Sequence, residues 1–166
     1  MKKAVSILVL FLCFMCFPLK AEGKTVEIYT AHDLVKLAKE CHYDAYSKDL
    51  RVELMSDISL RDVKDFSLMV FDGVFDGNGH TISDYIVDGR FSPCGFVGHL
   101  MDNGRIENLH IEGVSVPGGD GNNAGIFAGI NDGVIEDCSF KGTIKANENT
   151  GMAAGINNGV IKSFVA

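Results

Sequence analysis

The second half of the chain repeats one pattern of hydrophobic and polar positions three times. The copies begin at Gly95, Gly125 and Gly151. Each copy contains an Asx-Gly step two residues before an isoleucine: Ile106, Ile135 and Ile161. Apolar residues recur around each isoleucine with polar residues between them, which is typical of short β-strands that have one buried face.

The columns of the aligned repeats agree in character. Leu109, Cys138 and Phe164 follow the isoleucines by three residues, and we expect them to point inward and stack. Asn108, Asp137 and Ser163 are small polar residues suited to a corner. Glu107, Glu136 and Lys162 should face water. A unit this short cannot bury its apolar face alone, so the copies must stack, and the period leaves no room for a helix in each one. We therefore predict an all-β fold, a parallel β-helix (β-solenoid) in which each copy is one coil.

The front of the chain has a different pattern and contains only one glycine before residue 73, Gly23. A short strand at 25–29 should precede a helix at 30–41. Thr30 is a suitable N-cap, and Asp33 suits the helix dipole. An apolar stripe follows at helical spacing and consists of Leu34, Leu37, Ala38 and Cys41. We expect this amphipathic helix to cover the open end of the stack.

The hydrophobic pattern also divides the chain into segments. Residues 1–21 have a basic start and an apolar run that is too short for a confident membrane span, so they read as a secretory signal peptide. An uncleaved membrane anchor is the alternative. Residues 22–49 form the strand and cap helix. The coils occupy 50–166 and include the three repeats, 95–123, 124–150 and 151–166.

Charge and cysteine content narrow the partners. The net charge is −7, and it becomes −10 without residues 1–21, which hold three of the 15 basic residues and none of the 22 acidic ones. Such an acidic domain is a poor partner for nucleic acid or an anionic membrane surface. Three cysteines remain, Cys41, Cys94 and Cys138, and we expect buried thiols. A bridge between Cys94 and Cys138 on neighbouring coils is the alternative.

These residues resemble a known repeat. The segments GIFAGINDGVI at 125–135 and GMAAGINNGVI at 151–161 resemble the GLUG repeat of bacterial secreted and surface proteins. The first copy, GFVGHLMDNGRI at 95–106, departs from it by two inserted residues, and FDGVFDGNGHTIS at 71–83 resembles the coil that precedes such repeats in pectin-lyase-like β-helices. The resemblance implies a right-handed parallel β-helix. It also implies adhesin-like roles, and it carries no catalytic signature to any position here.

Two groups of residues could carry chemistry. Glu107 and Glu136 share a column on adjacent coils, and the coil spacing is close to the carboxylate separation of retaining glycosidases. Asp132 could join them. Asp72, Asp76 and Asn78 could share a calcium ion, although turn formation explains the same residues. No cofactor motif is expected.

We therefore interpret the chain as an exported bacterial β-solenoid module, secreted or on the cell surface. Its role would be structural or adhesive, with a glycan or protein as ligand, either alone or as a fragment of a larger surface protein. The alternative is a polysaccharide hydrolase or lyase, or the truncated front of one. The sequence favours the module over the enzyme. Because no capping element follows the third repeat, self-association through the C-terminal coil is also expected.

Overall fold

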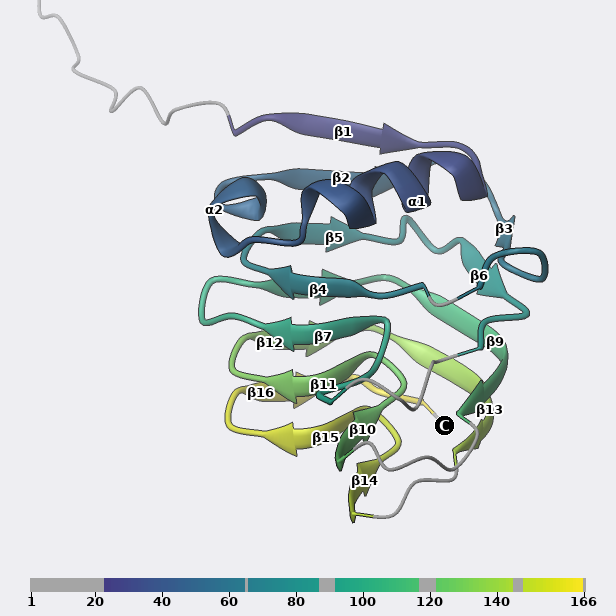
Figure 1. Ribbon diagram of the computed structural model, residues 1–166, viewed down its shortest axis with the longest axis vertical. Coiled ribbons are helices and arrows are strands. Elements are labelled where there is room, and N and C mark those ends of the chain that lie inside the picture. The colour runs from purple at the N-terminus through teal and green to yellow at the C-terminus, as the bar shows by residue number, and fades with distance from the viewer. Residues whose placement is uncertain (1–22, 65, 87–91, 117–121, 145–147, 166) are drawn as a thin grey trace, which may run out of the picture.

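The computed structural model describes residues 23–64, 66–86, 92–116, 122–144 and 148–165. The predicted signal peptide lies outside the described residues. The chain winds into a right-handed parallel β-solenoid, as predicted (Figure 1). In the figure, one sheet runs from left to right at the back, another runs from right to left at the front, and each winding descends below the one before it.

Three sheets form the faces of the solenoid, and all their strand pairs are parallel. Sheet A contains β1 (Thr25–Ile28), β2 (Arg51–Leu54), β5 (Val74–Asp76), β8 (Arg105–Glu107), β12 (Val134–Glu136) and β16 (Val160–Lys162). Sheet B contains β3 (Ile58–Ser59), β6 (Thr81–Ser83), β9 (His110–Val116) and β13 (Ser139–Ile144). Sheet C contains β4 (Leu68–Phe71), β7 (Val97–Leu100), β11 (Ala128–Asn131) and β15 (Ala154–Asn157). A fourth, two-stranded sheet pairs β10 (Asn122–Gly125) with β14 (Glu148–Gly151).

The predicted isoleucine column lies at the centre of sheet A. Ile135 is the Cα partner of Ile106 on one side and of Ile161 on the other. The same column continues upward through Phe75 and Val52. Ile106 and Ile135 are fully buried, and burial of a side chain of this size is worth about 1.5–3 kcal/mol. The repeat therefore stabilises the fold by placing equivalent apolar groups directly over one another.

The corner between sheets A and B has a left-handed backbone in four successive windings. The corner residues are Asn78, Asn108, Asp137 and Ser163, with φ angles of 50°, 53°, 52° and 50°. Asparagine and aspartate tolerate this conformation better than most residues. The predicted corner column is therefore confirmed, and it extends one winding further toward the N-terminus than the repeats do.

Aromatic side chains fill the upper windings. Phe96 packs against Phe75, Phe66 and Tyr85, with ring centroids 5.1, 5.5 and 6.2 Å apart. The buried Tyr85 hydroxyl donates a hydrogen bond to the Phe66 carbonyl, at 3.2 Å, so its one polar group is satisfied. Cys41, Cys94 and Cys138 are buried thiols, and Cys94 and Cys138 are not bridged to each other. Burial raises the pKa of both Cys41 and Cys138 to about 12.

The N-terminal segment contains the helix α1 (Ala31–Glu40), followed by the short helix α2 (Asp44–Ser47). Thr30 and Asp33 form a capping box at the start of α1, which satisfies backbone donors at the helix N-terminus. Leu34 and Leu37 are buried. The helix packs beside β4, the outermost strand of sheet C, so it takes the place of a sheet C strand in the first winding (Figure 1). Its predicted function as a cap over the stack stays a prediction.

The Asx-Gly turns bring successive windings into backbone contact. A Cβ atom added at Gly133 would lie 2.1 Å from the carbonyl oxygen of Gly104, and one added at Gly159 would lie 2.1 Å from that of Gly133. These glycines are therefore required by close approach of the backbones.

We predict that Gly133→Ala lowers the free energy of unfolding by about 1–3 kcal/mol, because the added methyl group must push two windings apart. Urea denaturation followed by circular dichroism measures the effect. The matched control is Asp102→Ala, an exposed residue in the equivalent turn one winding earlier, which should change stability by less than about 0.5 kcal/mol. Equal unfolding midpoints for the two variants would contradict the close approach.

Candidate functional site

One column of charged side chains runs along the outer face of sheet A. The strand register aligns it from winding to winding. From the N-terminal end, its members are Glu27, Glu53, Asp76, Glu107, Glu136 and Lys162. Adjacent paired strands lie about 4.8 Å apart, so the five carboxylates would repel one another unless cations lay among them. We call this column, together with Arg51 and Arg105, the charge ladder.

Arg51 neutralises the upper part of the charge ladder. It lies two residues before Glu53 on β2, and side chains two apart on a strand share a face. Its guanidinium contacts Glu53 at 2.8 Å, Asp76 at 2.5 Å and Glu107 at 3.4 Å. The hydrogen bond to Glu53 and the nearby Asp76 and Glu107 carboxylates raise the pKa of Arg51 above its ordinary value. One cation thus holds carboxylates from three successive windings.

Arg105 and Lys162 neutralise the lower part. Arg105 contacts Glu107 on its own strand, at 3.8 Å, and forms an ion pair with Glu136 on the next. The Lys162 ammonium lies 2.5 Å from the second Glu136 oxygen. Both Glu136 oxygens are therefore paired with cations. The residue is only 9% exposed, so these ion pairs are largely shielded from water.

The structure brings together two of the three residues of the catalytic alternative. Glu107 and Glu136 are Cα partners on β8 and β12, and Arg105 pairs with both. Asp132 lies in the turn before β12, where its carboxylate contacts His99 at 2.5 Å and Asn158 at 2.7 Å. The hydrogen bonds from Asn158 and His99 hold the pKa of Asp132 below its ordinary value. The contacts of Glu107 and Glu136 are those of a charge ladder, and a catalytic role for these residues stays a prediction.

The calcium candidates serve mainly as turn residues and ion-pair partners. Asp76 accepts hydrogen bonds from the Asn78 amide at 2.9 Å and the Asn108 side chain at 3.1 Å, besides its ion pair with Arg51. Asp72 instead accepts from Asn103 in the next winding, at 3.2 Å. The structure thus brings Asp76 and Asn78 together and gives Asp72 a different partner. Within the described ranges, no group of three or more His, Cys, Asp or Glu side chains could hold a metal ion.

The repeats do not reveal the upper half of the charge ladder. Arg51, Glu53 and Asp76 precede the first repeat, and no motif aligns them with Glu107. The available signal was the alternation on β2 and β5, which places a charged residue directly after each buried Val52 or Phe75.

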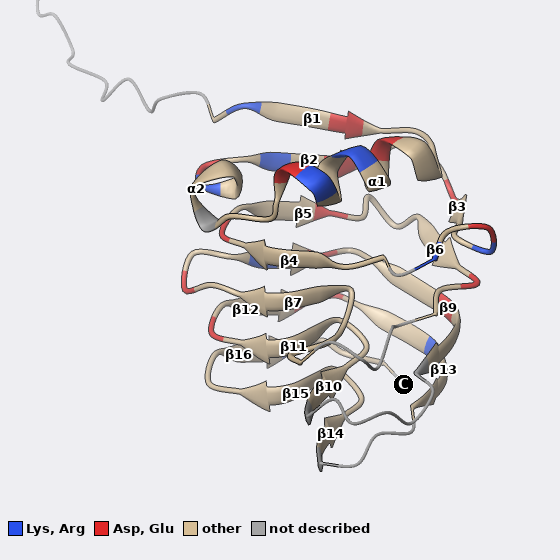
Figure 2. Cartoon of the chain, viewed as in Figure 1, with Lys and Arg blue, Asp and Glu red and all other residues tan. Residues whose placement is uncertain are grey.

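Sheet C differs from sheet A in charge. The strands of sheet C read LMVF, VGHL, AGIN and AGIN, without any Lys, Arg, Asp or Glu (Figure 2).

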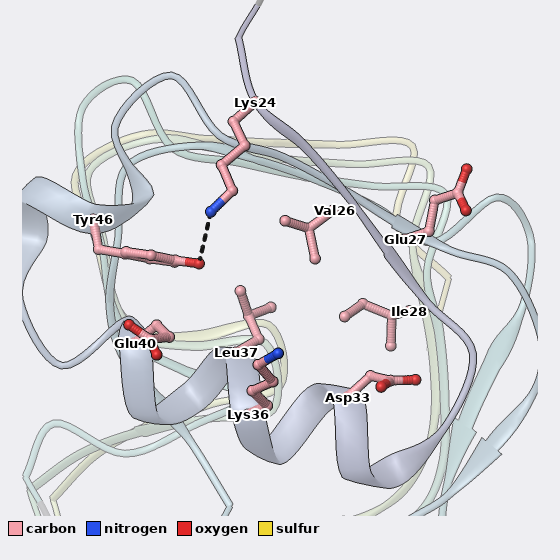
Figure 3. Close-up of a pocket in the computed structure, with 9 residues that line it drawn as sticks. All are labelled: Lys24, Val26, Glu27, Ile28, Asp33, Lys36, Leu37, Glu40 and Tyr46. Atoms are coloured by element: carbon pink, nitrogen blue, oxygen red, sulfur yellow. Dashed lines mark hydrogen bonds between the residues drawn. The ribbon is translucent and has the colours of Figure 1, made fainter.

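The N-terminal end of the solenoid is hollowed. A cavity of about 440 Å³ lies between β1 and α1 (Figure 3). Its lining includes apolar Val26, Ile28 and Leu37, and its polar members include Lys24, whose ammonium donates a hydrogen bond to the Tyr46 hydroxyl at 3.3 Å. No helix in the described part of the chain has the length and apolar character needed to span a membrane.

Comparison with known proteins gives one partial similarity. Halomucin of Haloquadratum walsbyi (strain DSM 16790 / HBSQ001) is 38% identical to this chain over 78 residues. The matched segment is 46% of this chain and 1% of halomucin, so the chain spans only a very small part of that relative's length. No family model matches the chain. No solved structure matches it either.

We predict that Arg51→Gln lowers the free energy of unfolding by about 1–2 kcal/mol. The change leaves Glu53 and Asp76 facing each other without the cation that now lies between them, and the partial exposure of Arg51 keeps the loss below that of a fully buried pair. Thermal or urea unfolding at low ionic strength measures it. The matched control is Arg61→Gln, because Arg61 is 76% exposed and pairs only with Asp84 among the ion pairs of the described residues. If Arg51→Gln cost no more than Arg61→Gln, the charge ladder would not be a stabilising network.

Proposed function

We propose that this chain is an exported structural module, secreted or on the cell surface, that presents fixed rows of side chains to a glycan or protein ligand. The observation that carries the proposal is the register of sheet A. The register places one residue from each of six strands in a single row on the outer face, and neighbouring residues of the row are separated by the spacing of paired strands. A rigid row of this kind can contact an extended ligand through several windings at once.

The outer face of sheet A is the proposed contact surface. Its cations remain partly accessible, since the side chains of Arg51, Arg105 and Lys162 are 40%, 37% and 57% exposed. The most accessible carboxylates of this face, Glu27 and Glu53, can accept hydrogen bonds from sugar hydroxyls or from basic side chains. Because the whole chain is acidic, the favoured ligand is a neutral glycan or a basic protein surface rather than a polyanion.

The other supports are indirect. The apolar run at the N-terminus supports export by a signal peptide comprising residues 1–21. The similarity to a small part of a very long protein fits a module that is used within larger chains. The GLUG-like segments at 125–135 and 151–161 fit a repeat of secreted proteins. The polysaccharide hydrolase or lyase remains the alternative, and the experiment below separates the two.

The test uses the full chain expressed with its leader in a secreting host. We expect protein in the medium whose intact mass corresponds to a chain beginning at Glu22. This protein should bind a member of a neutral glycan panel, and it should release no new reducing ends from that panel or from a second panel of uronate-containing polysaccharides, which are the substrates of lyases. The Glu107→Gln/Glu136→Gln variant should bind about tenfold more weakly, because it removes the carboxylates that hold the partly exposed Arg105 and Lys162 side chains in place on the contact surface.

The matched control is Glu112→Gln, an exposed carboxylate on sheet B, which should leave binding unchanged. Reducing ends released by the unaltered protein and lost in the double variant would overturn the module in favour of the hydrolase. Retention of the full-length chain in the membrane would overturn export. Equal binding by the double variant and the control would overturn sheet A as the contact surface.

A further inference from the structure

The two outermost strands of sheet A have matching unpaired edges. The order of the sheet begins with β1 and ends with β16, and among the described residues neither strand has a partner on its outer side. Unpaired edges with aligned donors and acceptors are templates for pairing with another strand.

The hydrogen bonds within the chain fix which groups face outward on β1. The carbonyls of Lys24 and Ile28 accept from the amides of Arg51 and Met55, at 2.9 and 2.8 Å. Peptide groups along a strand alternate in direction, so Val26 also faces β2. The amide and carbonyl of Thr25 and of Glu27 therefore point away from the solenoid.

On the opposite edge strand, β16, the outward-facing backbone groups lie at complementary positions. The Val160 amide donates to the Gly133 carbonyl at 2.9 Å, and the Lys162 carbonyl accepts from Asp137 at 3.3 Å. By the same alternation, the amide and carbonyl of Ile161 point away from β12. A strand that continues the sheet below β16 must therefore offer outward groups at the positions that Thr25 and Glu27 occupy.

The register needed between the two copies is the one that successive strands of sheet A already use. Val74 donates to Leu50 at 2.8 Å, and Arg105 donates to Gly73 at 2.8 Å, each to the residue before the partner strand's first position. One further step of this kind would pair Thr25 with the Gly159 carbonyl of another copy. It would also place Val26 beside Ile161.

Charge and shape agree with this register. The step sets Glu27 of one copy beside Lys162 of the other, so the acidic end of the charge ladder meets its basic end. The N-terminal end is hollow with apolar Val26 among its lining residues, and the C-terminal winding leaves Met152 57% exposed and the core residues Ile161 and Phe164 only partly buried.

We propose that a second copy of this chain docks head to tail, with β1 of one copy pairing in parallel with β16 of the other. The contact is heterologous, because different surfaces meet, and it can therefore repeat from copy to copy and build a rod. The inference rests on the proposed role as a structural module, and it gives that role a partner and a register.

Charge reversal tests the register. The purified protein, with its N-terminus defined by mass, should show weight-average mass that rises with concentration in sedimentation experiments. Glu27→Lys and Lys162→Glu should each weaken association about fivefold to tenfold, since each sets like charges opposite one another. An equimolar mixture of the two variants should associate again, because each contact then joins opposite charges. Glu112→Lys and Lys64→Glu are the controls, because both alter charges outside the proposed contact.

A second variant tests strand pairing directly. Thr25→Pro removes an amide that points outward, so it should abolish association while leaving the unfolding midpoint within the range of Thr25→Val, which keeps the amide. A protein that is monomeric at all concentrations, or single variants that associate as well as the unaltered chain, would overturn the proposal. Glycan binding by a monomeric Thr25→Pro variant would show that the ligand-binding role stands independently of assembly.

Discussion

The structure depends on the vertical register of parallel strands. Each winding pairs with the next through backbone hydrogen bonds, so every side chain lies beside its equivalent one strand spacing away. This constraint places Ile106, Ile135 and Ile161 in one column. Apolar columns gain from the constraint because like groups pack well. The same register also aligns the residues of every exposed column, including columns of like charge.

For charged residues the same register is a cost. The register would produce an uninterrupted acidic column of Glu27, Glu53, Asp76, Glu107 and Glu136. Arginines in the neighbouring column of the same face form ion pairs with these carboxylates. Arg51 reaches carboxylates on three windings, which a lysine could not do with the same geometry. The charge ladder is thus the arrangement by which this face accommodates stacked carboxylates, and it is the polar surface that sheet A presents to solvent.

The sequence predicted the fold well wherever the repeat supplied an internal alignment. The isoleucine column, the Asx corner and the helix near 31–40 all followed from residue patterns. The first windings have no repeat motif, so the partners of Arg51 depend on a register that only the folded chain shows. The position of α1 beside β4 also depends on tertiary packing, because amphipathicity predicts that one face of a helix is buried but not the element against which that face packs. Asp132 could not be separated from Glu136 by sequence, although the two contact different residues.

The most direct test of the account is a nuclear Overhauser measurement on protein with labelled isoleucine methyl groups. If equivalent side chains of successive windings are stacked, cross-peaks should join Ile106 with Ile135 and Ile135 with Ile161. The pair Ile106 and Ile161, two strand spacings or about 9.6 Å apart between backbones, should give a much weaker peak or none. Absence of both adjacent cross-peaks in a folded sample would contradict the stacked register and, with it, the solenoid.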